Sequence, residues 1–223
     1  MGFCVVTGCN RGIGLELVRQ LSERGHRLAA VCRTGSPALD SLGAEVIDGI
    51  DVSDIAAVSR LPERIGDRRI DLLINNAGVL RRDELGEIDD AGVEDILLQF
   101  RINSIGPLLV TQALLPCLAP DARVGIVSSR MGSIADNTSG GYYGYRMSKA
   151  AANMVGASLA RDLEDRGVAV AVLHPGYVRT EMTGGGGDVD PEQAASGLLA
   201  RLDELNLSNS GGFWHAKGEA LSW

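Results

Sequence analysis

The sequence predicts a doubly wound α/β domain in which helices cover both faces of a parallel sheet of about seven strands. Short β-branched runs alternate with helical patterns along the chain, the order that right-handed strand–helix–strand crossovers require. Most of these runs are continuously apolar, as expected for strands covered on both faces. A glycine-rich turn directly follows the first run. These three features together define the predicted fold class.

The predicted elements follow in regular order. Strands are expected at Phe3–Thr7, Arg27–Cys32, Glu45–Ile47, Leu72–Asn75, Arg123–Ser128, Val168–His174 and Gly212–His215. Helices are expected at Ile13–Arg24, Ile55–Ile65, Val93–Leu118, Tyr145–Arg166 and Pro191–Leu205. No linker rich in proline, glycine or serine divides the chain, so residues 1–223 are predicted to form one domain. The run Gly184–Gly187 predicts a mobile substrate loop near residues 182–190.

Composition excludes several classes of protein. Apolar residues are 45% and charged residues 22% of the chain, which is typical of a globular protein. The 21 basic and 29 acidic residues give a net charge of −8, which argues against a nucleic-acid-binding surface. No apolar run reaches the ~20 residues of a membrane span, and the first residues do not resemble a secretion signal. We therefore expect a cytoplasmic protein that binds neither nucleic acid nor membrane.

The cysteines and histidines give no sign of a metal site. Cys4, Cys9, Cys32 and Cys117 contain no Cys-x-x-Cys pair, and in this context they are expected to be buried small hydrophobic residues. The three histidines are too dispersed for a local metal-binding motif. No bound metal is therefore expected.

The glycine-rich turn after the first strand has the spacing G-x-x-x-G-x-G. Glycines at such a turn let the backbone approach a pyrophosphate, which the N-terminus of the following helix then stabilises. The turn therefore predicts a dinucleotide site in a Rossmann-like fold. Its residues are Gly8, Asn10, Arg11, Gly12, Ile13 and Gly14.

The end of the second strand bears on the choice between NAD and NADP. Enzymes that use NAD place an acid there for the ribose 2′-hydroxyl, whereas this chain has Arg33 and no acid before Asp40. Arg11, in the glycine-rich turn, is a second cation. Because guanidinium groups bind phosphate with paired donors, we predict NADP(H) in preference to NAD(H).

A Tyr-x-x-x-Lys pair, Tyr145 and Lys149, falls in a predicted helix. Residues four apart lie one turn apart on the same face, so the phenol and the ammonium group are expected to be neighbours. A cation beside the phenol is expected to lower its pKa from about 10 toward neutrality, where it can exchange protons. Lys149 is one of only two lysines in the chain, which makes a chance pairing rare.

Together these motifs resemble the short-chain dehydrogenase/reductase family in its compact single-domain form. Within the family the chain is most similar to the branch of C-factor and sniffer-like carbonyl reductases, to which residues 128–133 and 212–223 point. The motifs that carry the likeness are the glycine-rich turn, Asp51-Val52, Asn75–Gly78, Asn103, Ser129, Tyr145 with Lys149, and Pro175-Gly176 followed by Thr180.

The resemblance implies further contacts with the cofactor. Asp51 and Val52 would hold the adenine, and Asn76, Ala77 and Gly78 would leave room for a cofactor ribose. Pro175 and Gly176 would form a rigid turn under the nicotinamide, whose carboxamide Val178 and Thr180 would bind.

It also implies a reaction, the interconversion of a ketone, aldehyde or quinone and an alcohol by hydride transfer. Ser129 would stabilise the substrate oxygen. Tyr145 would act as general acid or base, Lys149 would bind the nicotinamide ribose and lower the pKa of the phenol, and Asn103 would anchor a water that relays protons to Lys149. For Asn103, a purely structural amide is the alternative. The 16 positions from Ser129 to Tyr145 leave Ser128 and Ser133 as rivals for the Ser129 role.

Other functions fit the chain less well. A sugar epimerase or dehydratase would need a separate substrate domain, and the G-x-S-x-G turn of a serine hydrolase is absent from the sequence. A nucleotide-binding signalling protein of the C-factor type, with turnover secondary, is the alternative. The resemblance also implies a homodimer or homotetramer that pairs through the helices at Val93–Leu118 and Tyr145–Arg166.

Overall fold

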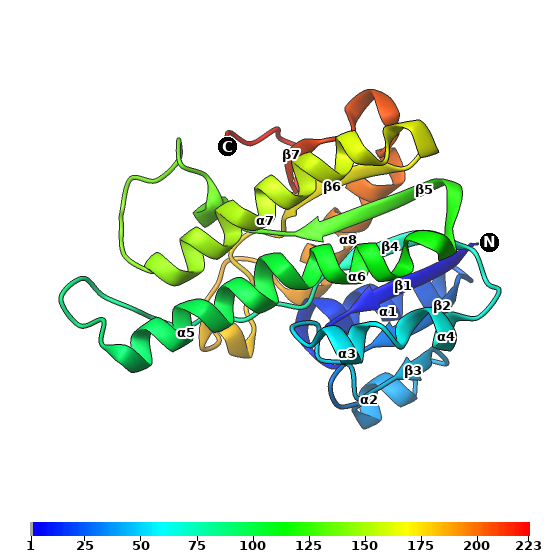
Figure 1. Ribbon diagram of the computed structural model, residues 1–223, viewed down its shortest axis with the longest axis horizontal. Helices are drawn as coiled ribbons and strands as arrows, with labels where there is room; N and C mark the ends of the chain where they lie inside the picture. The colour runs from blue at the N-terminus through cyan, green and yellow to red at the C-terminus, as the bar shows by residue number, and fades with distance from the viewer. Residues whose placement is uncertain (1) are drawn as a thin grey trace.

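The computed structural model describes residues 2–223, and its sheet confirms the predicted fold class (Figure 1). The strands are β1 Phe3–Thr7, β2 Arg27–Val31, β3 Glu45–Ile47, β4 Ile70–Asn75, β5 Leu118–Val127, β6 Ala169–His174 and β7 Gly212–His215. In the described chain they form one seven-stranded sheet in the order β3-β2-β1-β4-β5-β6-β7, and neighbouring strands are parallel. The chain moves outward in one direction after β1 and in the other after β4. A crevice is expected where these two directions part.

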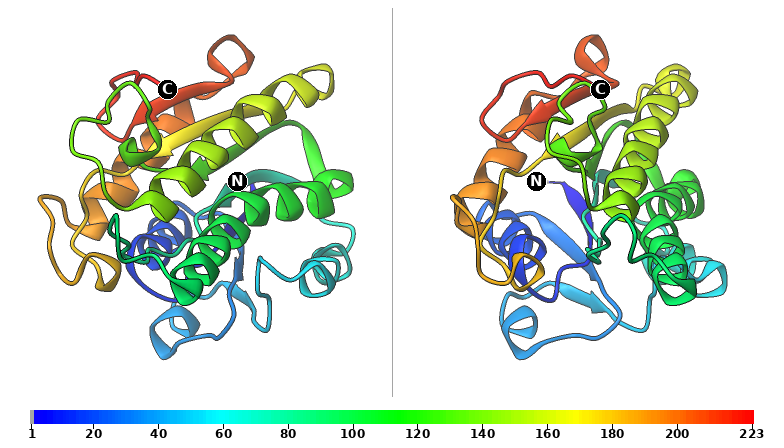
Figure 2. Two further views of the ribbon diagram at one scale, coloured as in Figure 1. Left: turned by 60° about the vertical axis from the view of Figure 1, so that its left-hand side comes forward. Right: turned by 90° about the vertical axis from the view of Figure 1, so that its left-hand side faces the viewer.

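Helices cover both faces of the sheet, as the two views in Figure 2 show. The helices are α1 Gly12–Glu23, α2 Pro37–Asp40, α3 Ile55–Val58, α4 Leu61–Ile65, α5 Asp90–Phe100, α6 Gly106–Leu114, α7 Tyr143–Asp162 and α8 Pro191–Glu204. Buried side chains of α4, α6 and α7 pack on one face of the sheet, and those of α1 and α8 pack on the other. The sheet is thus the middle of three layers.

The burial of adjacent residues of β1 shows why the strands are continuous apolar runs in the sequence. Successive side chains of a strand point to opposite faces. Val5 accordingly belongs to the core on the α6 and α7 side, whereas Val6 belongs to the core on the α1 and α8 side. Both are fully buried, so neither position tolerates a polar residue.

The prediction of one continuous helix over Val93–Leu118 is wrong, because the structure divides this region. Asp89 caps α5, and residues 101–105 form a π-helical turn between α5 and α6. Pro107, in the first turn of α6, has no N–H to donate to the carbonyl of Asn103 four residues earlier, so a regular α-helical ladder cannot run through this point. After α6, a 3-10 turn ends at Cys117 and β5 starts at Leu118, earlier than predicted.

Two shorter elements also differ from the prediction. The helix expected at Ile55–Ile65 is two short helices, because Pro62 cannot donate to Val58 and starts α4 instead. The short helix α2 was not predicted, although the hydroxyl of Ser36 caps it and Pro37 begins it.

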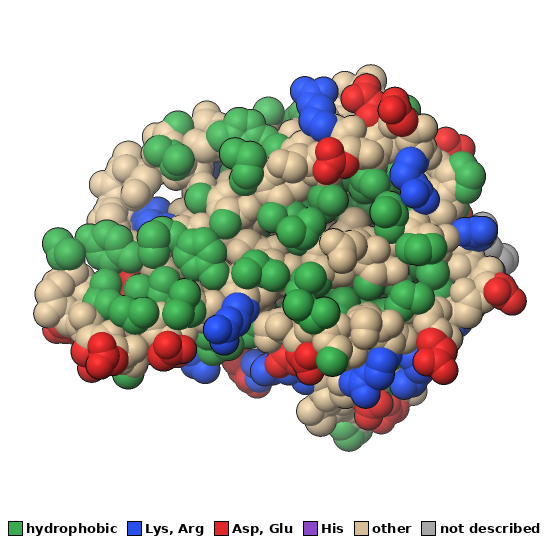
Figure 3. Space-filling model, viewed as in Figure 1, with side chains coloured by type: hydrophobic (Ala, Val, Ile, Leu, Met, Phe, Trp, Pro, Cys, Tyr) green, Lys and Arg blue, Asp and Glu red, His purple; other side chains and the backbone are tan. Residues whose placement is uncertain are grey.

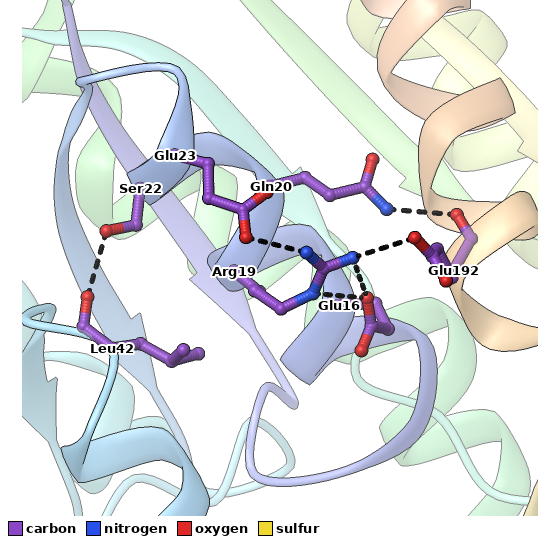
Figure 4. A network of polar contacts seen from close by, with 7 residues as sticks. All are labelled: Glu16, Arg19, Gln20, Ser22, Glu23, Leu42 and Glu192. Atoms are coloured by element: carbon purple, nitrogen blue, oxygen red, sulfur yellow. Dashed lines mark hydrogen bonds and ion pairs between the residues drawn. The ribbon is translucent and has the colours of Figure 1, made fainter.

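A polar network joins α1 to α8 on the outside of the sheet (Figure 4). Arg19 on α1 bonds Glu16 and Glu23 of its own helix and Glu192 of α8, the last at 3.3 Å. Gln20 donates to the carbonyl of Glu192 at 2.9 Å. Because α1 begins at the glycine-rich turn and α8 follows the 182–190 segment, this network holds together the two elements that flank the crevice.

Among residues 2–223, no helix combines the length and the hydrophobicity that crossing a membrane would require.

Candidate active site

A cleft of about 530 Å³ opens at the carboxyl ends of the strands, where the strand order reverses. The turns after β1, β2, β4 and β6 reach it, and the N-terminal part of α7 closes one end. Of the predicted cofactor residues, those that line it are Gly8, Asn10, Arg11, Gly12, Ile13, Gly14, Arg33, Asp51, Val52, Asn76, Ala77, Gly78, Tyr145, Lys149, Pro175 and Thr180. The structure therefore brings together side chains that the sequence spreads from residue 8 to residue 180.

The glycine-rich turn leaves no space for side chains at two positions. A Cβ on Gly14 would lie 2.2 Å from the carbonyl oxygen of Gly8, and a Cβ on Gly8 would lie 2.6 Å from the Cα of Ala77. The N-cap residue of α1, Arg11, makes no side-chain capping bond, and the first turn of α1 carries no acidic residue. The helix therefore presents free backbone N–H groups to the cleft, which suits an anionic pyrophosphate.

Asn76 fixes this turn against the end of β4. Its amide nitrogen donates to the carbonyls of Thr7 at 3.1 Å and of Gly8 at 2.9 Å. The small residues that follow it, Ala77 and Gly78, line the open cleft. The amide nitrogen of Asn76 thus holds the glycine-rich turn in place.

Arg33, after β2, and Asp51, after β3, both line the cleft. Burial opposes the ionisation of Asp51, but hydrogen bonds from Ser53 at 2.7 and 2.9 Å and the positive charge of Arg33 outweigh it and lower the pKa of Asp51. Arg11, in the glycine-rich turn, pairs with Glu181 of the segment after β6. Both arginines stand where the sequence predicts a phosphate-binding group.

Tyr145 and Lys149 lie one turn apart on α7 and are both buried. The Lys149 Nζ is 5.7 Å from the centre of the Tyr145 ring and donates to the carbonyl of Val127 at 2.9 Å. The hydroxyl of Ser129, two residues after the end of β5, lies close enough to the phenol of Tyr145 to favour a lower pKa of that phenol. The structure therefore brings the three predicted polar groups close together.

The sequence-based expectation for the phenol is wrong for the chain without cofactor. Burial raises the pKa of Tyr145 to about 12, and the nearby hydroxyl of Ser129 opposes this rise only in part. Burial also lowers the pKa of Lys149 to about 8. Both groups are buried away from water, which destabilises their charged forms. For Tyr145 this desolvation outweighs the stabilisation of the phenolate by one nearby cation.

The rival serines have other partners. Ser128 donates to Asn153 at 2.6 Å, and Ser133 donates to the backbone carbonyl of Trp223 at 3.1 Å. Ser128 lines the cleft, and Ser129 and Ser133 do not. Of the three, Ser129 is the one whose hydroxyl affects the pKa of Tyr145.

Asn103 lies in the π-helical turn, behind the cleft wall. Its amide nitrogen donates to the carbonyl of Val79 and to the hydroxyl of Ser148, both at 2.9 Å, and its oxygen accepts from the N–H of Val79 at 2.8 Å. This side chain ties the segment that follows β4 to α7. It does not line the cleft.

The segment after β6 folds back on itself. Gly176 and Val178 lie outside the cleft lining, and Val178 is buried in a bridge with Val189. The N–H of Thr180 donates to the hydroxyl of Thr183 at 3.1 Å, so it is already bonded. Arg179 pairs with Asp190 at 2.8 Å. These internal bonds hold the segment together, and the mobility of residues 182–190 stays a prediction.

Sequence reasoning missed Asp83. Its carboxylate accepts from the N–H groups of Tyr143 and Gly144, the first two residues of α7. No local sequence pattern could predict that a residue 61 positions away in the sequence caps α7. Further residues of the cleft were also missed: Val31, Cys32, Ile50, Val79, Ile102, Val127, Arg179, Glu181 and Pro191.

Among residues 2–223, no group of three or more His, Cys, Asp or Glu side chains could hold a metal ion.

Comparison with known proteins places the chain in a family. The family model for short chain dehydrogenases matches residues 3–188, and the chain belongs to that family. It is accordingly an oxidoreductase with the Rossmann-like fold, and the predicted resemblance is confirmed.

Two relatives in sequence are informative. The chain is 42% identical, over the full length of both, to the 1-hydroxy-2-glutathionyl-2-methyl-3-butene dehydrogenase of Rhodococcus sp. (strain AD45). It is 45% identical to the C-signal protein of Myxococcus xanthus, over 69% of this chain and 93% of that one.

Two solved structures share its architecture. The NADPH-bound carbonyl reductase from chicken fatty liver superposes with a TM-score of 0.89 at 30% identity, covering 99% of this chain and 98% of that one. The carbonyl reductase Sniffer of D. melanogaster gives a TM-score of 0.88 at 27% identity, covering 100% and 99%. These likenesses agree with the predicted branch of the family.

Proposed function

We propose that this chain interconverts a carbonyl compound and an alcohol with NADP(H), using Tyr145 as general acid and base. The observation that carries the proposal is that Tyr145 and Lys149, both buried, line a cleft that the glycine-rich turn also lines, with the buried Ser129 beside the phenol. A binding protein without turnover would have no need of a buried phenol beside a buried ammonium group.

The cleft fits a dinucleotide. The glycine-rich turn and the bare N-terminus of α1 would hold the pyrophosphate, while Asp51 and Val52 would face the adenine. Arg33 and Arg11 would bind a 2′-phosphate, which favours NADP(H) over NAD(H). When bound, the nicotinamide supplies or accepts the hydride. The NADPH in the chicken reductase supports this choice of cofactor.

The polar groups of the chain would handle the proton. In the direction of reduction, the Ser129 hydroxyl holds the carbonyl oxygen and Tyr145 donates its proton to that oxygen as the alcohol forms. The positive charge of Lys149 stabilises the phenolate that remains. Asn103 would act by holding the Val79 backbone and Ser148 in place around Lys149. Pro175, Gly176, Val178 and Thr180 would shape the nicotinamide end of the site.

Substitution of Tyr145 by Phe tests the proposal. The variant should lose NADPH-dependent reduction of aldehydes, ketones and quinones, followed by nicotinamide absorbance, and should keep its affinity for NADPH. Tyr143→Phe, two residues earlier on the same helix, is the matched control and should keep most of the activity. Unchanged turnover in Tyr145→Phe would refute the assigned role.

The likeness to C-signal supports a second candidate, a signalling protein that binds the nucleotide with turnover secondary. Tyr145→Phe separates the two functions, because signalling through nucleotide binding would survive the loss of the phenol. The four free cysteines of the described chain favour a reducing compartment, and we place the protein in the cytoplasm.

We also propose that two copies pair through α5, α6 and α7. Figure 3 shows apolar side chains gathered on the face that these helices form. Their spacing supports a continuous stripe, because positions four and seven apart share a helix face. The exposed members are Val93 and Leu97 on α5, Leu108 on α6, and Met147 and Met154 on α7.

A further inference from the structure

Cys9 and Cys32 lie side by side although 22 residues separate them in the sequence. The parallel pairing of β1 and β2 sets Thr7 opposite Val31. The next residue, Gly8, donates its N–H to the carbonyl of Val31 at 2.9 Å. The Cys9 thiol donates to the same carbonyl at 3.3 Å, and Val31 directly precedes Cys32. Both side chains also belong to the same buried cluster, on the α1 side of the sheet.

The two sulfurs differ in how they can be reached. Both residues are buried, but Cys9 is 0% exposed inside the glycine-rich turn, whereas Cys32 is 4% exposed and belongs to the cleft lining next to Arg33. A small molecule that enters the cleft therefore meets Cys32 first and finds Cys9 behind it. The other two cysteines, Cys4 in β1 and Cys117 before β5, do not line the cleft.

The contact also sets an order of reactivity. The neighbouring thiol of Cys9 lowers the pKa of Cys32, although burial opposes this, and the Cys32 thiol together with burial raises the pKa of Cys9. Cys32 is therefore the better thiolate and the attacking group, while Cys9 is the thiol that resolves the product.

We infer that Cys9 and Cys32 form an oxidisable dithiol in the wall of the cleft, which a hydroperoxide closes to a disulfide. The Cys32 thiolate attacks one peroxide oxygen, forms a sulfenic acid and releases hydroxide. The Cys9 sulfur then attacks the Cys32 sulfur, the S–O bond breaks and water leaves. The two thiols lose two electrons and two protons, and hydrogen peroxide is reduced to two molecules of water.

The modification would act on nucleotide binding, and this consequence rests on the proposed function. A disulfide would draw Cys9 toward β2. The turn is packed too closely to accommodate this shift, because even a Cβ atom on Gly8 or Gly14 would clash with neighbouring backbone atoms. A bound dinucleotide would in turn cover Cys32 and slow its oxidation.

The test is peptide mapping after peroxide treatment. Trypsin places Cys9 on peptide 1–11 and Cys32 on peptide 28–33, but Cys4 shares the first peptide, so the experiment uses a Cys4→Ala background. We expect peroxide to link peptides 1–11 and 28–33 with the loss of two hydrogen atoms, and dithiothreitol to reverse the link. Cys9→Ser should instead leave a sulfenic acid on Cys32 that dimedone traps. Cys117 is the internal control and should remain reduced.

The outcomes separate the dithiol from the proposed function. Unlinked peptides, with Cys32 either reduced or oxidised to sulfinic acid, would overturn the dithiol, as would oxidation of Cys117 at the same rate as Cys32. The link itself does not require that the chain bind a nucleotide. Saturating NADP⁺ should slow its formation, and oxidation should weaken NADP⁺ binding by about tenfold or more. A link that forms at the same rate with NADP⁺ present would retain the dithiol and refute the placement of the nucleotide.

Discussion

The carboxylate of Asp83 accepts a hydrogen bond at 2.9 Å from the backbone N–H of Gly144, at the start of the helix that carries Tyr145. The same carboxylate also accepts from Tyr143, so one side chain satisfies two of the free N–H groups of α7. Gly144 is required for this contact, because a Cβ there would lie 3.0 Å from the Asp83 carboxylate and 2.6 Å from the amide of Gln99. The position of the phenol therefore depends on a loop distant in sequence.

Replacement of Asp83 by Ala should cost about 1 kcal/mol of stability, as the loss of a helix cap does. It should also lower kcat by about tenfold, because small displacements of a reacting group are costly, and leave the Kd of NADPH unchanged. Denaturant titration and steady-state kinetics measure the two effects. Asp89→Ala removes the cap of α5 and is the control. It should lose similar stability and keep kcat; an equal fall in kcat would contradict the role of Asp83.

Lys149→Met should stabilise the cofactor-free protein near neutral pH. In the wild-type protein the pKa of Lys149 falls from 10.5 in the unfolded chain to about 8 in the folded protein. Between these two pH values the unfolded state therefore binds more protons, and the stability of the wild type rises with pH. The full shift corresponds to about 3 kcal/mol at most. Chemical unfolding at several pH values should show a difference between variant and wild type that shrinks from pH 8 upward. Parallel pH profiles would refute the buried ammonium.

Gly14→Ala should abolish NADPH binding and cost about 2 kcal/mol of stability, although alanine favours helices over glycine. The reason is the 2.2 Å approach of its Cβ to the carbonyl oxygen of Gly8. Gly35→Ala is the control, since its Cβ would lie 3.6 Å from a methyl group of Val46, an ordinary contact. Calorimetric titration with NADPH distinguishes them. Normal binding by Gly14→Ala would mean that the turn does not approach the nucleotide.

Arg33→Ala should weaken NADPH binding by about tenfold to a hundredfold, the range for a lost hydrogen bond to a charged group. Its affinity for NADH should not change, because NADH has no 2′-phosphate. Fluorescence titration with both cofactors gives the ratio. Arg60→Ala is a suitable control, since Arg60 lies outside the cleft lining. An equal loss for both cofactors would remove the basis for the NADP preference.

Leu97→Glu and Met154→Glu should convert the proposed dimer to a monomer, because each places a charge on the apolar face of α5, α6 and α7. Light scattering coupled to gel filtration measures the mass. Leu207→Glu, at an exposed apolar position before β7, should leave the mass unchanged. A monomeric wild-type protein would exclude the dimer.

The amino-acid sequence alone was enough to predict the layered fold and most of the cleft lining. Continuous apolar runs require cover on both faces, and glycines at a strand–helix turn, Arg33 after β2 and a Tyr-x-x-x-Lys helix are local signals. Each of these signals depends on residues close together in the sequence, so it can be recognised without knowledge of the fold.

Contacts between residues far apart in the sequence depend on tertiary packing, and the sequence did not predict them. Three examples depend on packing between distant segments: the cap that Asp83 gives to α7, the shared cluster of Cys9 and Cys32, and the bonds of Asn103 to Val79 and Ser148. Burial likewise reversed the expected shift of the phenol, because desolvation depends on everything that surrounds a group and not on its neighbours along a helix.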